Sequence, residues 1–312
     1  MSQVAPNILH IRAESLKAIR DYFYQQRVLE VDTPLLSEYS VTDPYMSAMQ
    51  THNHCGNPLG YLQTSPEYAM KKLLCHGSGD IYQLGKVFRA DETSPNHNNE
   101  FTMLEWYRTG FDEYQLMDEV FRIITLIIGA RARQTLSYRA VFDQYLGIDP
   151  FTISYGSLAT TATKLLGELP REMLFDNFLT LLFAEKIEPQ FDPSSITFIT
   201  DFPASQASLA QIHQTPYGEV ARRFEAYSGG LELANGFYEL GDAASQLSRF
   251  KADNQIRATL GYPQITIDSD LIRALQKGLP ACAGVALGVD RLLMLKIGAT
   301  AIQQVLPMSM AK

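Results

Sequence analysis

The sequence predicts an α+β fold built around an antiparallel sheet. Two long segments, residues 81–89 and 101–107, read as strands joined by a turn-rich stretch with Pro95 and several asparagines, which is typical of a hairpin. Helical patterns lie apart from these strands instead of alternating with single strands, which favours α+β over a parallel α/β sheet.

Each further element follows from a local pattern. Apolar residues at helical spacing predict a helix over residues 8–23, followed by a strand over 28–31 that Pro34 stops. Ser65 is expected to cap a helix with Pro66 at its first position, ending near Gly77. Asp290 is expected to cap a helix that starts at Arg291. The remaining predicted segments are helices over 116–128 and 158–183 and strands over 196–200, 231–240 and 285–287.

Composition excludes several classes of protein. The chain has 312 residues, 46% hydrophobic and 19% charged, which is ordinary for a globular protein. No apolar run is long enough to cross a membrane, and no signal peptide is visible. Three widely spaced cysteines suit a reducing cytoplasm. The net charge of −8 argues against a large RNA-binding surface.

The predicted hairpin carries the first candidate chemistry. The chain has no phosphate-binding glycine loop, so a nucleotide would need arginine and magnesium instead. Arg89 ends one strand, where a guanidinium can grip a phosphate through two hydrogen bonds. On the return strand Glu105 and Tyr107 share one face with Phe101 and Met103, and a carboxylate beside a phenol suits an ammonium-bearing substrate. The alternative is a hairpin whose polar face is simply solvated.

Two glutamates form the second candidate. Glu232 and Glu239 are seven apart, so a regular strand would point them to opposite faces. A bulge at Asn235 and Gly236 would bring them to one face, where they would hold magnesium through oxygen ligands. The alternative is a pair of unrelated surface glutamates, which their apolar surroundings disfavour.

The third candidate is the glycine-rich segment 284–295. Its glycines let the backbone pass close to a flat ring, and Arg291 is placed to pair with a terminal phosphate. The alternative is a glycine-rich turn into a core helix. A cluster of His52, His54 and Cys55 lacks a fourth ligand nearby, so no metal is expected there.

Together these segments resemble the three sequence motifs of class II aminoacyl-tRNA synthetases. The first motif is the helix and strand ending at Pro34, the second covers residues 88–107, and the third covers 284–295. The stretches TSPE (64–67), HNNEFTMLEWY and ELANGFYEL are similar to the lysyl-tRNA synthetase subgroup. The resemblance implies a class II catalytic core and a homodimer, since the first motif lies at the dimer interface in that family.

Two departures narrow the resemblance. The core starts within the first ~15 residues, so we expect no anticodon-reading OB-fold before it. The segment 202–211 and Ala286 also differ from a usual lysyl-tRNA synthetase. Both features resemble the free-standing paralogues that attach (R)-β-lysine to translation elongation factor P. We therefore expect a single catalytic domain over 1–312, with a helical insertion at roughly 141–190, that recognises this factor and (R)-β-lysine or lysine.

The resemblance also implies a role for each matching position. Arg89 would contact the α-phosphate of ATP and Arg291 the γ-phosphate, which makes both catalytic. Glu232 and Glu239 would hold Mg²⁺. The further ATP contacts implied are Ala90, Asp91, Asn98, Leu233 and Gly288. The amino-acid contacts implied are Ser65, Pro66, Glu67, Tyr107, Glu239 and Ala286.

Three other functions stay open at this point. A truncated lysyl-tRNA synthetase would charge tRNA, which the acidic charge and the absent anticodon domain disfavour. A non-catalytic regulatory subunit would be expected to have lost Arg89, Glu232 or Arg291, and all three are present. An asparagine synthetase of the same fold would bind an acidic side chain, whereas the set of Glu67, Tyr107 and Glu239 suits a cationic one better.

Overall fold

The computed structural model describes residues 6–90, 93–170 and 173–308. The chain divides into two compact units: a first unit of Met1–Gly129 with Glu239–Lys312, and a second unit of Ala130–Tyr238. Among the described residues, no helix is both long and apolar enough to cross a membrane.

Four strands of the first unit form a mixed sheet. They are β1 (Leu29–Glu30), β5 (Ile81–Phe88), β6 (Glu100–Thr109) and β12 (Cys282–Gly288), and they lie in that order. The β1–β5 pair is parallel, and the β5–β6 and β6–β12 pairs are antiparallel. A separate small sheet has the order β2 (Leu36–Ser37), β4 (Pro58–Leu62), β3 (Gln50–His52).

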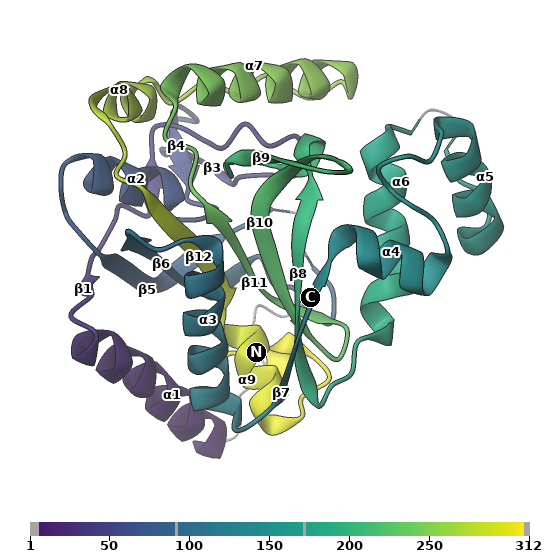
Figure 1. The fold of residues 1–312 in the computed structure, drawn as a ribbon. Helices are drawn as coiled ribbons and strands as arrows, with labels where there is room; N and C mark the ends of the chain where they lie inside the picture. Colours follow the sequence, from purple (N-terminus) through teal and green to yellow (C-terminus); the bar gives the residue numbers. More distant parts are fainter. Residues whose placement is uncertain (1–5, 91–92, 171–172, 309–312) are drawn as a thin grey trace. The chain divides into compact units, whose positions relative to one another are not determined.

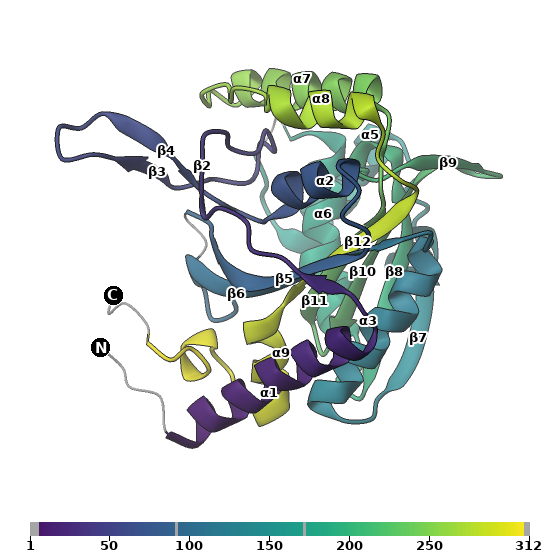
Figure 2. The same ribbon diagram turned by 90° about the vertical axis from the view of Figure 1, so that its left-hand side faces the viewer.

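Six α-helices accompany these strands in the described part of the first unit. They are α1 (Pro6–Gln25), α2 (Glu67–Cys75), α3 (Glu113–Ile128), α7 (Ala243–Thr259), α8 (Ser269–Lys277) and α9 (Val289–Ile297). Figure 1 shows α1 beside α3, and Figure 2 shows α7 and α8 side by side above α2. The apolar side of α2 covers one end of the sheet through a buried cluster of Met70, Leu74, Ile81, Tyr107 and Cys282.

Local sequence explains why these helices form where they do. In α1 the buried positions Arg12, Ser15, Ile19 and Phe23 recur every three to four residues, so one side of the helix faces the core. At the start of α3, Asp112 and Gln115 form reciprocal hydrogen bonds that satisfy backbone donors of the first turn.

The second unit has its own strands and an aromatic core. The strands lie in the order β11 (Leu231–Tyr238), β10 (Gly218–Ser228), β8 (Ser195–Pro203), β7 (Ala132–Ser137), and β9 (Ile212–Thr215) also pairs with β10. Its helices are α4 (Tyr138–Leu146), α5 (Tyr155–Leu166) and α6 (Phe175–Leu182), which a π-helical turn extends over Phe183–Ile187. Figure 1 shows α5 packed beside α6. Stacked rings such as Tyr138 on Phe183, with centroids 5.6 Å apart, fill the core between these helices and the strands.

The α+β prediction is confirmed, and most predicted elements are present. The hairpin of β5 and β6, helices α1 and α3, and β12 followed by α9 lie where expected. The helix predicted over 158–183 is divided into α5 and α6, with a break that begins at Gly167. Helices α4–α6 fall mainly within the expected insertion at roughly 141–190. The expectation of one catalytic domain over 1–312 stays a prediction.

Three local predictions were wrong. Pro66, not Ser65, occupies the N-cap position of α2, and no side chain caps that helix. Gly288 is the N-cap of α9, so Asp290 lies in the first turn, where its carboxylate has other partners. The bulge in β11 falls at Leu233 instead of Asn235 and Gly236, because Ala226 and Tyr227 of β10 pair with Ala234 and Glu232.

Candidate active site

A row of small residues on β12 faces the functional side of β6. Gly284 pairs with Tyr107, Ala286 with Glu105, and Gly288 with Met103. Residues directly opposite each other in antiparallel strands point to the same face. The face that carries Glu105 and Tyr107 is therefore lined on its neighbouring strand by two glycines and one alanine, so no large side chain of β12 projects onto it.

Gly284 makes the closest approach in this row. A Cβ atom on Gly284 would lie 2.3 Å from Cε1 of Tyr107 and 2.5 Å from Oε1 of Glu239. Those distances are far inside van der Waals contact, so only glycine lets the Tyr107 ring and the Glu239 carboxylate meet over this strand. The sequence showed that glycines here allow a close approach but not which side chains use the space.

An acidic cluster stands on this face. Glu67 and Lys71 from α2, Glu105 and Tyr107 from β6, and Glu239 after β11 come together, and all but Glu67 are almost fully buried. Lys71 Nζ lies 2.9 Å from Glu67 Oε1 and 2.6 Å from Glu239 Oε2. The Tyr107 hydroxyl donates to Glu105 Oε1 at 2.8 Å. Glu67, Tyr107 and Glu239 were predicted site residues, whereas Lys71 was missed although its i,i+4 spacing from Glu67 is visible in the sequence.

Burial perturbs the protonation of this cluster. Burial, opposed by the Lys71 ammonium, raises the pKa of Glu239 to about 7. Burial and the nearby Glu67 carboxylate raise the pKa of Glu105 well above its ordinary value. Burial lowers the pKa of Lys71, but Glu239 and Glu67 outweigh that effect and raise it, so the ammonium stays charged. The carboxylic acids of such a buried site can release their protons when a ligand with an ammonium group binds to them.

Arg89 lies at the end of β5, next to the loop that opens α2. Its guanidinium stands over the Phe101 ring, 5.3 Å from the centroid, and its Nε donates to the Thr64 carbonyl at 3.4 Å. Thr64 precedes Ser65 and Pro66, so the proposed phosphate-binding arginine touches the segment expected to hold the amino acid.

The other predicted nucleotide contacts in this region lie around the hairpin turn. The Ala90 amide donates to the Ser47 carbonyl at 2.8 Å. The Asn98 amide donates to the Glu100 carbonyl at 2.7 Å, which fixes its side chain in the loop. Asp91 lies outside the described residues.

Arg291 reaches the same loop from α9. Its Nη2 lies 2.6 Å from Nε2 of His97, and its Nε donates to the Asn96 carbonyl at 3.3 Å. Because arginine can only donate, His97 Nε2 accepts, and its Nδ1 then donates to Ser94 Oγ at 2.7 Å. His97 was not predicted, and only its place in the motif HNNEF could have suggested it.

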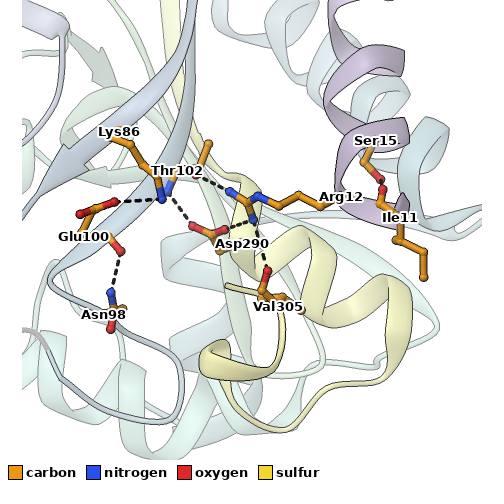
Figure 3. A network of polar contacts seen from close by, with 9 residues as sticks. All are labelled: Ile11, Arg12, Ser15, Lys86, Asn98, Glu100, Thr102, Asp290 and Val305. Atoms are coloured by element: carbon orange, nitrogen blue, oxygen red, sulfur yellow. Dashed lines mark hydrogen bonds and ion pairs between the residues drawn. The ribbon is translucent and has the colours of Figure 1, made fainter. Parts of the chain in front are cut away.

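A buried ion pair anchors the start of α9 (Figure 3). Arg12 extends from α1 and donates to Asp290 Oδ1 and to Thr102 Oγ1, both at 2.5 Å. The second oxygen of Asp290 accepts the backbone N–H of Thr102 at 2.6 Å. Asp290 thus joins α1, β6 and α9, and it directly precedes Arg291, so the network positions that arginine.

In the second unit, Glu232 and Leu233 lie on β11, Leu233 at the bulge. Burial has the largest effect on the pKa of Glu225 of β10 and raises it, whereas the neighbouring Arg223 lowers it. Glu232 is close enough to Glu225 to raise that pKa further. Arg223 forms an ion pair with Glu225 and lies over the Phe202 ring, 4.6 Å from its centroid. Glu225 was not predicted. Among the described residues, no three metal-ligating side chains are grouped as a preformed metal site.

Comparison with known proteins agrees with this geometry. The family described as tRNA synthetases class II (D, K and N) matches residues 1–312. A protein of Hamiltonella defensa subsp. Acyrthosiphon pisum named elongation factor P--(R)-beta-lysine ligase is 46% identical over 95% of this chain and 92% of its own length. Relatives with the same name from Photorhabdus laumondii and Mannheimia succiniciproducens are 46% and 45% identical over 96% of the chain, covering 94% and 93% of their own lengths. The chain belongs to the class II tRNA synthetase family and, within it, to the group of these ligases.

Proposed function

We propose that this protein is an ATP-dependent, AMP-forming ligase that activates (R)-β-lysine or lysine and transfers it to a lysine of translation elongation factor P. Relatives covering nearly the whole chain carry the name of this activity. The observation that carries the proposal in the structure itself is the buried acidic cluster of Glu67, Glu105 and Glu239. It offers three carboxylates and one phenol to a ligand on a face lined by small residues.

The proposed chemistry needs no nucleophilic side chain. A carboxylate oxygen of the amino acid attacks the α-phosphorus of ATP, pyrophosphate leaves, and an aminoacyl-adenylate forms. The ε-amine of the partner's lysine then attacks the carbonyl carbon, loses a proton, and forms an amide as AMP leaves. Arg89 stabilises charge on the transferring phosphoryl group, and Arg291 holds the far end of the triphosphate, so alignment and electrostatics supply the rate.

Magnesium would bind with ATP. It would supply positive charge to the phosphate oxygens. Glu232, expected to be a ligand, lies on β11, and its carboxylate offers the hard oxygen donors that this ion prefers. Glu239 is paired with the Lys71 ammonium, which favours a role in amino-acid binding over one in metal binding. Glu225 is likewise paired with Arg223, so we propose Glu232 as the protein ligand of the ion.

Ala286 is our candidate for selecting the β-amino acid. It faces the same side as Glu105, so its methyl group lies over the proposed amino-acid site. A β-amino acid carries its amine one carbon further from the carboxylate, and one carbon in a pocket is worth ~1–3 kcal/mol, or roughly 10–200-fold in specificity. We expect Ala286→Gly to raise kcat/KM for α-lysine relative to (R)-β-lysine. An unchanged ratio would assign selectivity elsewhere, for example to residues 202–211.

We also propose a cytoplasmic homodimer. Strand β1 lies at an edge of its sheet, and large apolar side chains near it are exposed, with Tyr24 at 84%, Leu29 at 56% and Leu36 at 45%. Exposed apolar groups beside an open strand edge favour burial against another chain. Light scattering should give about twice the 35.0 kDa chain mass, and a value of one chain would refute the dimer.

Amino-acid-dependent exchange of pyrophosphate into ATP tests the activation step. We expect exchange with (R)-β-lysine or lysine, requiring magnesium, and little with aspartate or asparagine. Equal exchange with aspartate or asparagine would refute the proposed substrate class. No exchange with any amino acid would favour a regulatory subunit.

A further inference from the structure

A lysine lies inside the site that we propose for a cationic substrate. The Lys71 side chain is 1% exposed and bridges Glu67 on α2 and Glu239 after β11. A buried cation should repel a substrate ammonium, so its presence needs a physical reason. Nothing in the adenylation chemistry requires an amine at this place.

The charge count of the cluster supplies that reason. Two carboxylates contact the one ammonium, and Glu105 is close enough to feel its charge, so two negative charges stay uncompensated when Glu67, Glu105 and Glu239 are all ionised. Oε2 of Glu105 is buried and has no hydrogen-bond partner among the described residues. A buried, unpaired carboxylate oxygen is costly unless a ligand donates to it, which indicates that a donor binds here.

Without a fixed cation, buried carboxylates such as Glu105 and Glu239 would lose their charge more readily. Like charges in a low-dielectric site raise each other's pKa, so the groups take up protons and lose their charge. A pocket of neutral carboxylic acids would accept a neutral ligand about as well as a cation. The Lys71 ammonium opposes this at Glu239, where it lowers the pKa that burial raises.

We infer that Lys71 is a positioning and specificity-determining residue: its ion pairs hold the Glu67 and Glu239 carboxylates in place, so that the pocket selects an amino acid with a charged ammonium side chain over a neutral one of the same shape. The inference rests on the proposed lysine-like substrate. It assigns Lys71 an effect through the two glutamates, with no contact to the reacting atoms.

The neighbouring titratable groups do not replace Lys71 in this role. Cys75 on α2 and Cys282 on β12 face the cluster, and burial raises the pKa of both thiols, which stay neutral. Burial and the Glu105 carboxylate raise the pKa of Tyr107, which stays a phenol. From α8, Asp268 pairs with Lys72 at 2.6 Å. The carboxylates and Lys71 therefore set the charge of the pocket near neutral pH.

The test compares Lys71→Met, which removes the charge at similar length, with Lys71→Arg, which keeps it. Lys72→Met is the matched control, since Lys72 is the next residue on α2 but pairs with Asp268. The measurements are KM in pyrophosphate exchange and calorimetric binding of the preferred lysine and of its 6-hydroxy analogue, in which a hydroxyl replaces the ammonium. Each is measured from pH 6 to pH 9.

We expect Lys71→Met to raise KM for lysine roughly tenfold to a hundredfold at pH 7, the range of a lost charge-assisted hydrogen bond. Discrimination against the hydroxy analogue should fall by the same factor, and KM should recover as the pH rises and the carboxylates ionise. KM for ATP should stay within about twofold, and Lys71→Arg and Lys72→Met should keep the wild-type discrimination.

Unchanged discrimination in Lys71→Met, or a fall in kcat alone without pH dependence, would overturn the inference. If Lys71→Met does not fold, Lys71→Gln carries the same expectations, because its amide can still donate to Glu67. If the wild-type protein activates another amino acid, the proposed function fails, and calorimetry with lysine and its hydroxy analogue still decides the role of Lys71.

Discussion

The substitution Gly284→Ala adds one methyl group at the closest contact in the proposed amino-acid site. The new Cβ atom would lie 2.3 and 2.4 Å from two carbons of the Tyr107 ring and 2.5 Å from Oε1 of Glu239. Unstrained carbon contacts are about 3.5–4.0 Å, so the ring would have to retreat by roughly 1 Å. Tyr107 is 2% exposed and packs against Met70, Leu74 and Ile81, so it has no free space to enter.

The size of the effect follows from this collision. Overpacking of a buried site costs about 1–3 kcal/mol, which lowers stability but leaves a protein of ordinary stability folded. A displacement of about 1 Å in a positioning group can cost roughly a hundredfold in rate. We expect Gly284→Ala to lower kcat/KM for lysine by about 10–100-fold, mainly through a higher KM for lysine. KM for ATP should be nearly unchanged.

Pyrophosphate exchange at varied lysine and varied ATP provides the assay, and Gly85→Ala is its control. Gly85 is also a strand glycine that faces Met103, but a Cβ there would lie 3.6 Å from its nearest neighbour, an ordinary contact. Wild-type kinetics for Gly284→Ala, or an equal loss in Gly85→Ala, would refute the claim that this contact shapes the site.

Three further predictions address the nucleotide side and the protonation of the site. Arg89→Ala should lower exchange by ~10²-fold or more while the circular dichroism spectrum is unchanged, and near-normal exchange would remove Arg89 from the reacting phosphate. Arg12→Lys keeps the charge but not the forked contact with Asp290 and Thr102, so KM for ATP should rise roughly tenfold with KM for lysine unchanged, whereas equal changes in both would indicate a merely structural network. Because burial raises the pKa of Glu239 to about 7 and its ionised form binds the ammonium, KM for lysine should rise as the pH falls below 7 and level off above it, and a flat profile between pH 6 and 8 would contradict this role.

The raised pKa of Glu239 also determines how this group changes the free energy of unfolding with pH. Glu239 holds its proton up to about pH 7 in the folded protein, against 4.5 ordinarily. The folded state therefore binds more protons between these values, and the contribution of this group to stability falls as the pH rises from 4.5 to 7.

The sequence predicts elements well where one face is apolar and the other polar. The hairpin of β5 and β6 and helix α1 show such periodicity, and their bounds agree with the structure within a few residues. Strand β10 was not predicted because it buries Glu225 and Ser228 beside apolar residues, so its alternation is hidden. Helix α7 was not predicted because few of its residues are buried apolar ones, Phe250 among them.

The candidate site divides in a similar way. Residues such as Arg89, Tyr107 and Glu239 were identified because they match the family motifs that the chain resembles. Lys71 was missed because a lysine on a helix next to another lysine is ordinarily solvated surface, and only the fold shows that it points inward between two glutamates. Arg12 was missed because its partner Asp290 lies 278 positions away in the chain, so only the fold brings the two side chains together.

The central claim is that this protein activates a lysine-like amino acid and transfers it to a protein. The most direct measurement is mass spectrometry of purified elongation factor P after incubation with the enzyme, ATP, magnesium and (R)-β-lysine or α-lysine, beside a parallel reaction with lysine-accepting tRNA. The account predicts one added lysyl group on a lysine of elongation factor P, lost in Arg89→Ala, and no charged tRNA. An unmodified factor together with charged tRNA would contradict it.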